Sequence, residues 1–204
     1  MIRFFTFALV LTSTIICQPM NHSEVIDVKR KILGIKMSGQ IDHRTTDEKG
    51  WHYRHYDIGG SFPITESWSA AIQYRSVYTL KDSDWILEKR PHAQIQKTIN
   101  TNRAKWTIKS RQEYRIRDGK DPALRNRVRV MAKSKSSWKK LKPYIGNEFF
   151  YDMEINKYNK NRLLIGFDLT QFEFFTPSIA FRHINALSND KWKTTYTMIL
   201  KISF

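Results

Sequence analysis

Apolar and polar residues alternate with a period of two from Lys31 to the end of the chain. The pattern is clear in residues 68–75, where one face would carry Trp68, Ala70, Ile72 and Tyr74 and the other Ser69, Gln73 and Arg75. Because successive side chains of a strand point to opposite faces, this period predicts an all-β fold. The segments predict a single antiparallel up-and-down β-barrel over residues 31–204. Alternation alone does not say which face is wet, and the features described below favour a transmembrane β-barrel. It would have about ten strands, with eight to twelve compatible with the pattern.

The first seventeen residues differ from the rest of the chain. Arg3 is followed by the uncharged, mostly apolar stretch Phe4–Cys17. This stretch is shorter than the roughly 20 residues of a membrane-spanning helix but is typical of a signal-peptide core. We therefore expect a cleaved signal peptide over residues 1–17 and a polar periplasmic tail over residues 18–30. A buried N-terminal element and lipidation of Cys17 are the alternatives.

The chain carries a net charge of +16, and 13% of its residues are aromatic. A soluble exported barrel with its arginines in water would bind polyanions such as nucleic acid. The leader favours a membrane barrel instead, as do predicted strands of about 10 to 13 residues, near the length that crosses a bilayer obliquely. Aromatic residues also gather toward the predicted strand ends, as in an aromatic girdle: Trp51, Tyr53, Trp68, Tyr78, Trp85, Trp106, Tyr151, Trp192 and Tyr196.

The connections between the predicted strands alternate in length. Residues 42–50, 80–84, 152–159 and 185–191 form the mostly long polar connections, whereas 63–67, 100–103 and 171–174 are tight. Two connections depart from this alternation: 118–122 is shorter and 134–140 is longer than it requires. Outer-membrane barrels have long external loops and short periplasmic turns. The sequence therefore predicts the outer membrane of a Gram-negative bacterium. The expected partners are outer-membrane lipid, lipopolysaccharide and, during biogenesis, the barrel assembly machinery; no nucleic acid is expected.

Two sets of residues carry a resemblance. The chain ends in an alternating strand whose apolar face is formed by Tyr196, Met198, Leu200, Ile202 and Phe204. This ending resembles the C-terminal signal by which the assembly machinery recognises outer-membrane barrels. The chain from Trp51 to Phe204 also resembles a bacterial family known only as a domain of unknown function and expected to form such barrels. The residues concerned are Arg111–Arg117, Leu124–Arg129, Pro143–Phe149 and Asn161–Arg162. The resemblance implies a fold and a location but no activity.

The polar face carries many charges that a membrane barrel would enclose. We predict a charge network inside the lumen, because isolated buried charges are costly and must pair. Its predicted members are Arg111, Glu113, Arg115, Arg117, Arg125, Arg127, Arg129, Glu148, Arg162 and Asp168. A structural role or a role in surface interactions follows from this interpretation. A narrow anion-conducting pore is the alternative use of the same cations.

Catalysis is the remaining class of function. The stretch Arg182–Ala186 partly resembles the His-x-Ser-Asn motif of lipid A deacylases, with His183 as the histidine. In that family the histidine activates the neighbouring serine. Asn185 stands where the serine is needed, so a lipid A-modifying enzyme is an alternative only and we expect no enzymatic activity. The histidines show no metal-ligand spacing, and we expect no metal and no cofactor.

Overall fold

A computed structural model describes residues 20–188 and 190–204 of the chain. The predicted signal peptide, residues 1–17, lies outside these residues. Eleven strands follow one another: β1 (Met20–Ile32), β2 (Ile35–Thr46), β3 (Gly50–Pro63), β4 (Trp68–Lys81), β5 (Asp84–Asn100), β6 (Ala104–Arg117), β7 (Lys120–Ser134), β8 (Leu141–Asp152), β9 (Lys157–Leu169), β10 (Thr176–Ser188) and β11 (Lys191–Ser203). No helix among the described residues is long and apolar enough to cross a membrane.

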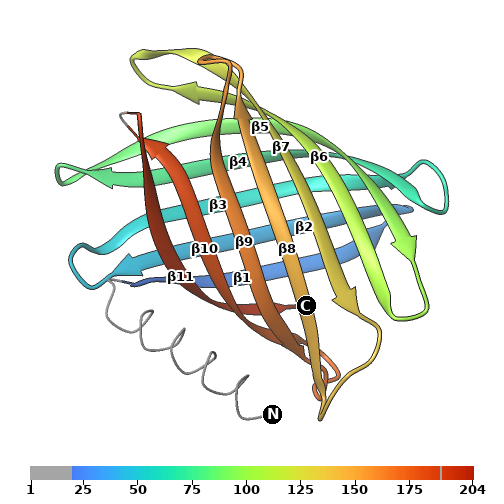
Figure 1. The fold of residues 1–204 in the computed structure, drawn as a ribbon. Helices are drawn as coiled ribbons and strands as arrows, with labels where there is room; N and C mark the ends of the chain where they lie inside the picture. The colour runs from blue at the N-terminus through green and yellow to red at the C-terminus, as the bar shows by residue number, and fades with distance from the viewer. Residues whose placement is uncertain (1–19, 189) are drawn as a thin grey trace.

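The eleven strands form one closed barrel in which each strand is paired with its neighbours in the sequence (Figure 1). Consecutive strands are antiparallel, and β1 closes the barrel by pairing in parallel with β11. An odd number of up-and-down strands requires this, because the first and last strands then run in the same direction. The predicted all-β barrel is confirmed, with one strand more than the ten that the sequence suggested. Met20 and Phe204 consequently lie at opposite ends of the barrel.

The additional strand is β1, in the segment for which the sequence predicted a polar tail over residues 18–30. That prediction was wrong, because β1 pairs with β2 over eleven residues. Ser23, Val25 and Asp27 are buried, whereas Ile26 and Val28 are exposed. The polar residues of this segment face a lumen that is itself polar, so a low hydropathy does not prevent them from forming a strand.

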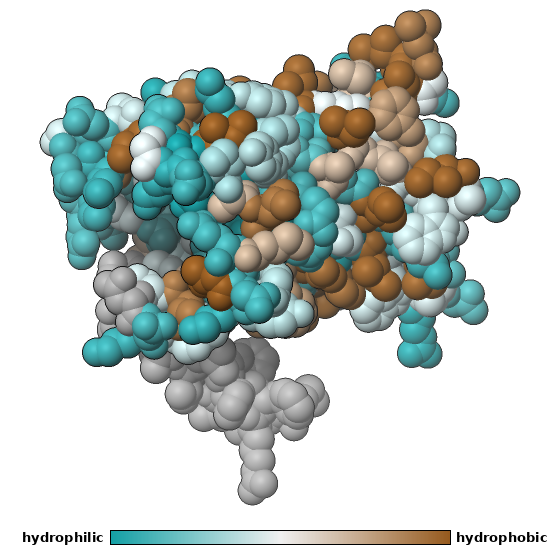
Figure 2. Space-filling model, turned by 90° about the horizontal axis from the view of Figure 1, so that it is seen from above, coloured by the Kyte–Doolittle hydropathy of each residue, from teal (hydrophilic) through white to brown (hydrophobic). Residues whose placement is uncertain are grey.

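The barrel has a charged interior and an apolar exterior. Carboxylates, arginines and histidines from many strands are buried, whereas large apolar side chains such as Ile58 and Ile72 are 62% and 69% exposed. Figure 2 shows hydrophobic side chains gathered on one face of the molecule, with hydrophilic ones mainly toward its edges. The predicted alternation is therefore present, with the apolar set on the outside.

The connections at one end of the barrel are shorter than the sequence predicted. The connections expected to be long consist of only residues 47–49, 82–83, 153–156 and 189–190, whereas 135–140 and 170–175 at the opposite end are longer. The predicted alternation of long and short connections was wrong, because the polar residues at the strand ends continue the ladders. Although the alternation begins at Lys31, Leu33 lies in a two-residue turn with Gly34, where both residues have positive φ (48° and 81°).

Candidate functional site

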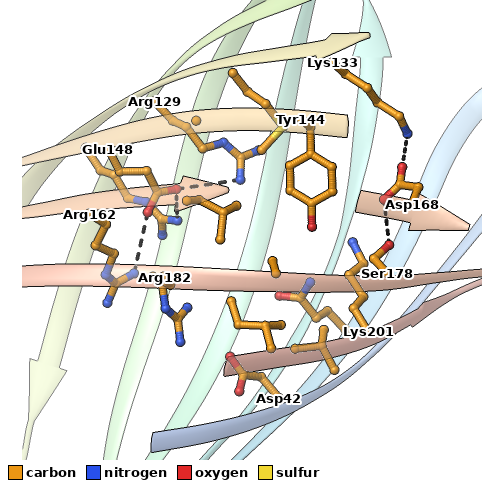
Figure 3. A pocket seen from close by; sticks show the side chains of 18 of the residues that line it. Asp42, Arg129, Lys133, Tyr144, Glu148, Arg162, Asp168, Ser178, Arg182 and Lys201 are labelled. Atoms are coloured by element: carbon orange, nitrogen blue, oxygen red, sulfur yellow. Dashed lines mark hydrogen bonds and ion pairs between the residues drawn. The ribbon is translucent and has the colours of Figure 1, made fainter. Parts of the chain in front are cut away.

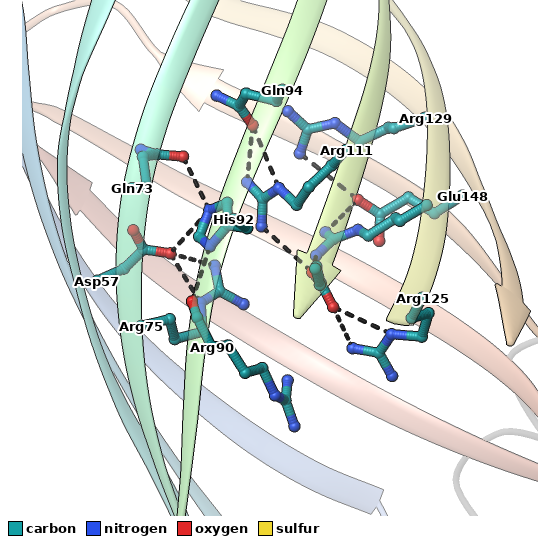
Figure 4. Close-up of polar contacts among 12 residues, drawn as sticks. Asp57, Gln73, Arg75, Arg90, His92, Gln94, Arg111, Arg125, Arg129 and Glu148 are labelled. Carbon is teal, nitrogen blue, oxygen red and sulfur yellow. Dashed lines mark hydrogen bonds and ion pairs between the residues drawn. The ribbon is translucent and has the colours of Figure 1, made fainter. Parts of the chain in front are cut away.

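Glu113 on β6 is the centre of the interior charge network. Its side chain is 1% exposed and accepts a 3.0 Å hydrogen bond from Nε of Arg125 on β7. Arg111 and Arg127 each place a guanidinium nitrogen 3.6 Å from its Oε1. Figure 4 shows two of these arginines, Arg111 on β6 and Arg125 on β7, among the polar contacts of the lumen. One buried carboxylate therefore serves three guanidinium groups.

Glu148 on β8 is the second centre. Arg127 donates a hydrogen bond of 2.5 Å to its Oε1. Nη1 of Arg129 lies 3.7 Å from the same oxygen, and Nη1 of Arg162 lies 3.6 Å from Oε2. The register explains this position, because Glu148 is paired with Arg129 on β7 and with Arg162 on β9. Because Arg127 contacts both Glu113 and Glu148, the two centres form one connected cluster.

The structure thus brings together seven of the ten predicted network residues and separates the other three. Arg115 donates a 2.5 Å hydrogen bond to Glu88 on β5. Arg117 lies at the strand end, 3.2 Å from the exposed Glu154. Asp168 on β9 pairs with Lys133 and accepts a 2.7 Å hydrogen bond from Ser178.

Further interior ion pairs lie outside the predicted set. Arg75 lies 2.6 Å from Asp57, Arg90 lies 2.7 Å from Glu88, and Arg44 lies 2.6 Å from Asp42. In the last two pairs the partners are two residues apart in the sequence. Opposite charges at a spacing of two share one face of a strand, and this signal identifies both pairs once the strand bounds are known.

Phe150 on β8 is an aromatic residue inside the lumen. It is 1% exposed, and the guanidinium carbon of Arg162 lies 4.7 Å from its ring centroid. Arg125 and Arg127 lie 5.2 Å from the same centroid, which is within cation–π range. Because its neighbours in the sequence are also aromatic, the sequence pattern around Phe150 does not show that its side chain faces the lumen. Only the parity with Glu148 and Asp152 places it on the inner face.

A cavity of about 300 Å³ lies in the lumen next to Glu148 (Figure 3). Its charged lining residues are eight cationic side chains and three carboxylates: Arg44, Arg75, Arg127, Arg129, Lys133, Arg162, Arg182, Lys201, Asp42, Glu148 and Asp168. Guanidinium groups bind carboxylate and phosphate oxygens through paired N–H donors. The arrangement is therefore suited to pairing internal carboxylates and to binding an added anion.

The C-terminal residues predicted to form an assembly signal share the outer face of β11. Leu200, Ile202 and Phe204 are all exposed, and Tyr196 and Met198 have the same parity. The backbone of Phe204 also closes the barrel. Its N–H donates to the carbonyl of Asp27 (2.9 Å), and its carbonyl accepts from the N–H of Lys29 (3.1 Å).

His183 lies on the outer face of β10, with the opposite parity to the buried Ala180 and Ile184. Its ring packs 5.3 Å from that of Tyr196, and its cross-strand partners are Tyr196 and Leu163. Asn185, at the position of the deacylase serine, accepts a 2.7 Å hydrogen bond from Thr194. Within the described residues, these cross-strand neighbours supply neither a serine nor a carboxylate beside His183.

A family model described as a protein of unknown function (DUF2490) matches residues 26–171. The chain belongs to the DUF2490 family. The match covers the cluster around Glu113 and Glu148 and ends before β10, so the C-terminal residues from Tyr196 lie beyond it. No curated protein is similar to the chain in sequence.

Proposed function

We propose that this DUF2490 protein is a small outer-membrane β-barrel whose lumen is closed by an internal charge network. The observation that carries the proposal is the position of the tryptophans. The chain has six, and all are 37% to 68% exposed. Trp51, Trp85 and Trp192 lie at the end of the barrel where β3, β5 and β11 begin. At the opposite end lie Trp68, Trp106 and Trp138. Two such girdles are typical of transmembrane barrels.

The surface between the two girdles supports the same proposal. Ile58, Ile72 and Ile108 face outward and are exposed, and each lies away from the ends of its strand. The strands have 12 to 17 residues, which exceeds the roughly 9–11 residues that an oblique crossing needs. A soluble barrel that binds polyanions would instead present its arginines to water. Here Arg111 and Arg125 are buried.

The proposal assigns a structural role to the lumen and no catalytic activity to the chain. Glu113 and Glu148 hold arginines from β6, β7 and β9 together. These pairs connect neighbouring strands in place of an apolar core. Lipid and lipopolysaccharide would contact the outer face, and the barrel assembly machinery would insert the chain.

Insertion into lipid vesicles tests the proposal. The chain without residues 1–17 is refolded from urea in the presence of phosphatidylcholine vesicles. We expect insertion, seen as heat-modifiable gel migration and as quenching of tryptophan fluorescence by brominated lipid. Ile58→Lys should oppose insertion by about 2–4 kcal/mol near the bilayer midplane. Glu66→Lys, in an exposed turn, is the control and should insert normally.

The two substitutions also distinguish the soluble alternative. In a soluble barrel, Ile58→Lys replaces an exposed apolar side chain with a charge and should leave folding intact or improve solubility. A protein that folds in buffer without lipid, and whose Ile58→Lys variant folds equally well, would refute the membrane proposal.

A further inference from the structure

Three arginines around the cavity beside Glu148 are left without a carboxylate of their own. Eight cationic side chains line this cavity. Five of them have a close acidic partner: Arg44 pairs with Asp42, Arg75 with Asp57, Arg127 with Glu148, Lys133 with Asp168, and Lys201 with Asp27. Arg129 and Arg162 reach only Glu148, at 3.7 and 3.6 Å, and that carboxylate is already occupied by Arg127. Arg182 is the third.

Arg182 has the least compensated side chain of the three. In the described part of the chain, no carboxylate forms an ion pair with it, and its buried Nε and Nη2 have no hydrogen-bond partner. The buried Nε of Arg162 also has none. Arg182 is paired with Leu164 on β9. Arg162 precedes Leu164 by two residues, so its side chain lies on the same face of the sheet as that of Arg182. Figure 3 shows both guanidinium groups along the cavity.

Unpartnered buried donors on positive groups are costly, because a buried charge loses its hydration without gaining a partner. An anion in the cavity would accept hydrogen bonds from these donors and offset their charge. Guanidinium groups bind tetrahedral oxyanions through several charge-assisted hydrogen bonds. A dianion would also neutralise two of the three remaining charges, whereas a carboxylate would neutralise one.

We propose that the cavity beside Glu148 is a binding site for an oxyanion of the phosphate class, held by Arg182, Arg162 and Arg129. Ala180 and Ile199 also line the cavity, and its volume of about 300 Å³ admits such an ion together with water. The site faces the lumen, so its ligand is a soluble anion and not a lipid on the outer surface. The inference goes beyond the structural role proposed above and does not depend on the membrane location.

Thermal unfolding of the detergent-refolded chain tests the site. The melting temperature is measured in inorganic phosphate, sulfate, acetate and chloride at one ionic strength and one pH. Because a ligand that binds only the folded state stabilises it, phosphate and sulfate should raise the melting temperature relative to chloride. Acetate should raise it less. Equal melting temperatures in phosphate and chloride, or an equal increase in acetate, would overturn the proposal.

Arg182→Gln is the decisive variant, and Arg103→Gln, in an exposed turn, is its control. Arg182→Gln removes an uncompensated charge, so it should melt higher than the wild type in chloride and lose most of the increase in phosphate. Calorimetric titration with inorganic phosphate should show binding weakened by about tenfold or more, the effect of losing one charge-assisted hydrogen bond. Arg103→Gln should bind as the wild type does. Unchanged phosphate binding by Arg182→Gln would refute the site.

Titration of the wild type keeps the test decisive if Arg182→Gln fails to fold. The folded wild-type barrel should bind about one phosphate ion with saturation. Excess sulfate should compete with phosphate, and excess chloride should not. Absence of saturable binding would exclude the site without affecting the membrane proposal, because vesicle insertion is measured separately.

Discussion

Glu113 on β6 and Arg125 on β7 are paired directly across the two strands and joined by a hydrogen bond of 3.0 Å from Nε of Arg125. The next inward pair along these strands consists of two arginines, Arg111 and Arg127. Like charges in direct cross-strand positions destabilise a sheet. Glu113 lies within 3.6 Å of both arginines, so its carboxylate offsets this repulsion.

Replacing Glu113 with glutamine should therefore destabilise the barrel. The substitution keeps the shape of the side chain and leaves the guanidinium groups of the buried Arg111 and Arg125 and of Arg127 without their common partner. Breaking a buried ion pair costs on the order of 3 kcal/mol. Urea unfolding of the detergent-refolded barrel, followed by tryptophan fluorescence, measures the change. Glu154→Gln, which affects an exposed pair with Arg117, should unfold like the wild type. Equal stability of the two variants would contradict the network.

The lumen should not conduct ions. Glu113 and Phe150 are each 1% exposed although both face the lumen, so in the described part of the chain the lumen is packed against these two side chains. Arginines surround the Phe150 ring at 4.7 to 5.2 Å. We expect planar-bilayer recordings to show no steady current. Single-channel currents whose anion selectivity falls in Arg127→Glu would instead support the anion pore.

The fold was largely predictable because period-two alternation persists through nearly every strand. The prediction is wrong where polar residues form a strand instead of a loop. β1 contains buried Ser23 and Asp27, and a polar strand beside a polar lumen has the composition of a tail. The same reasoning made the connections too long, because the polar residues at strand ends also form ladder hydrogen bonds.

The charged site was predictable in part for a similar reason. Arg111, Glu113, Arg125 and Arg127 lie on clearly alternating strands, so their shared face follows from sequence spacing. Which cation meets which carboxylate depends on the register between strands. The pairing of Glu148 with both Arg129 and Arg162 therefore became visible only in the structure.

The terminal aromatic residue should act in assembly. Phe204 is 50% exposed on the outer face, and its backbone hydrogen bonds to β1 do not require its ring. Phe204→Ala should therefore reduce the amount of inserted protein while leaving export unchanged. Quantitative blotting of membrane and periplasmic fractions measures both. Phe172→Ala, which removes another exposed aromatic residue, is the control. Equal insertion of both variants and the wild type would show that the Phe204 ring has no role in assembly.

The junction of β1 and β11 should be the least stable pairing in the barrel. It is parallel, which is the slightly weaker arrangement per residue, and it has eight register pairs against thirteen between β10 and β11. Asp27 on β1 supports it with a 2.9 Å ion pair to Lys201. Hydrogen exchange should be faster at this junction and faster still in Asp27→Asn. Uniform protection across β1, β10 and β11 would contradict this prediction.

The location of the chain in a Gram-negative cell is the most direct test of the account. The full chain is expressed, membranes are separated on a sucrose gradient, and the protein is followed by blotting with and without heating. We expect the protein in the outer-membrane fraction, resistant to extraction with carbonate, and shifted in gel migration on heating. Recovery of folded protein in the soluble periplasmic or cytoplasmic fraction would contradict the account.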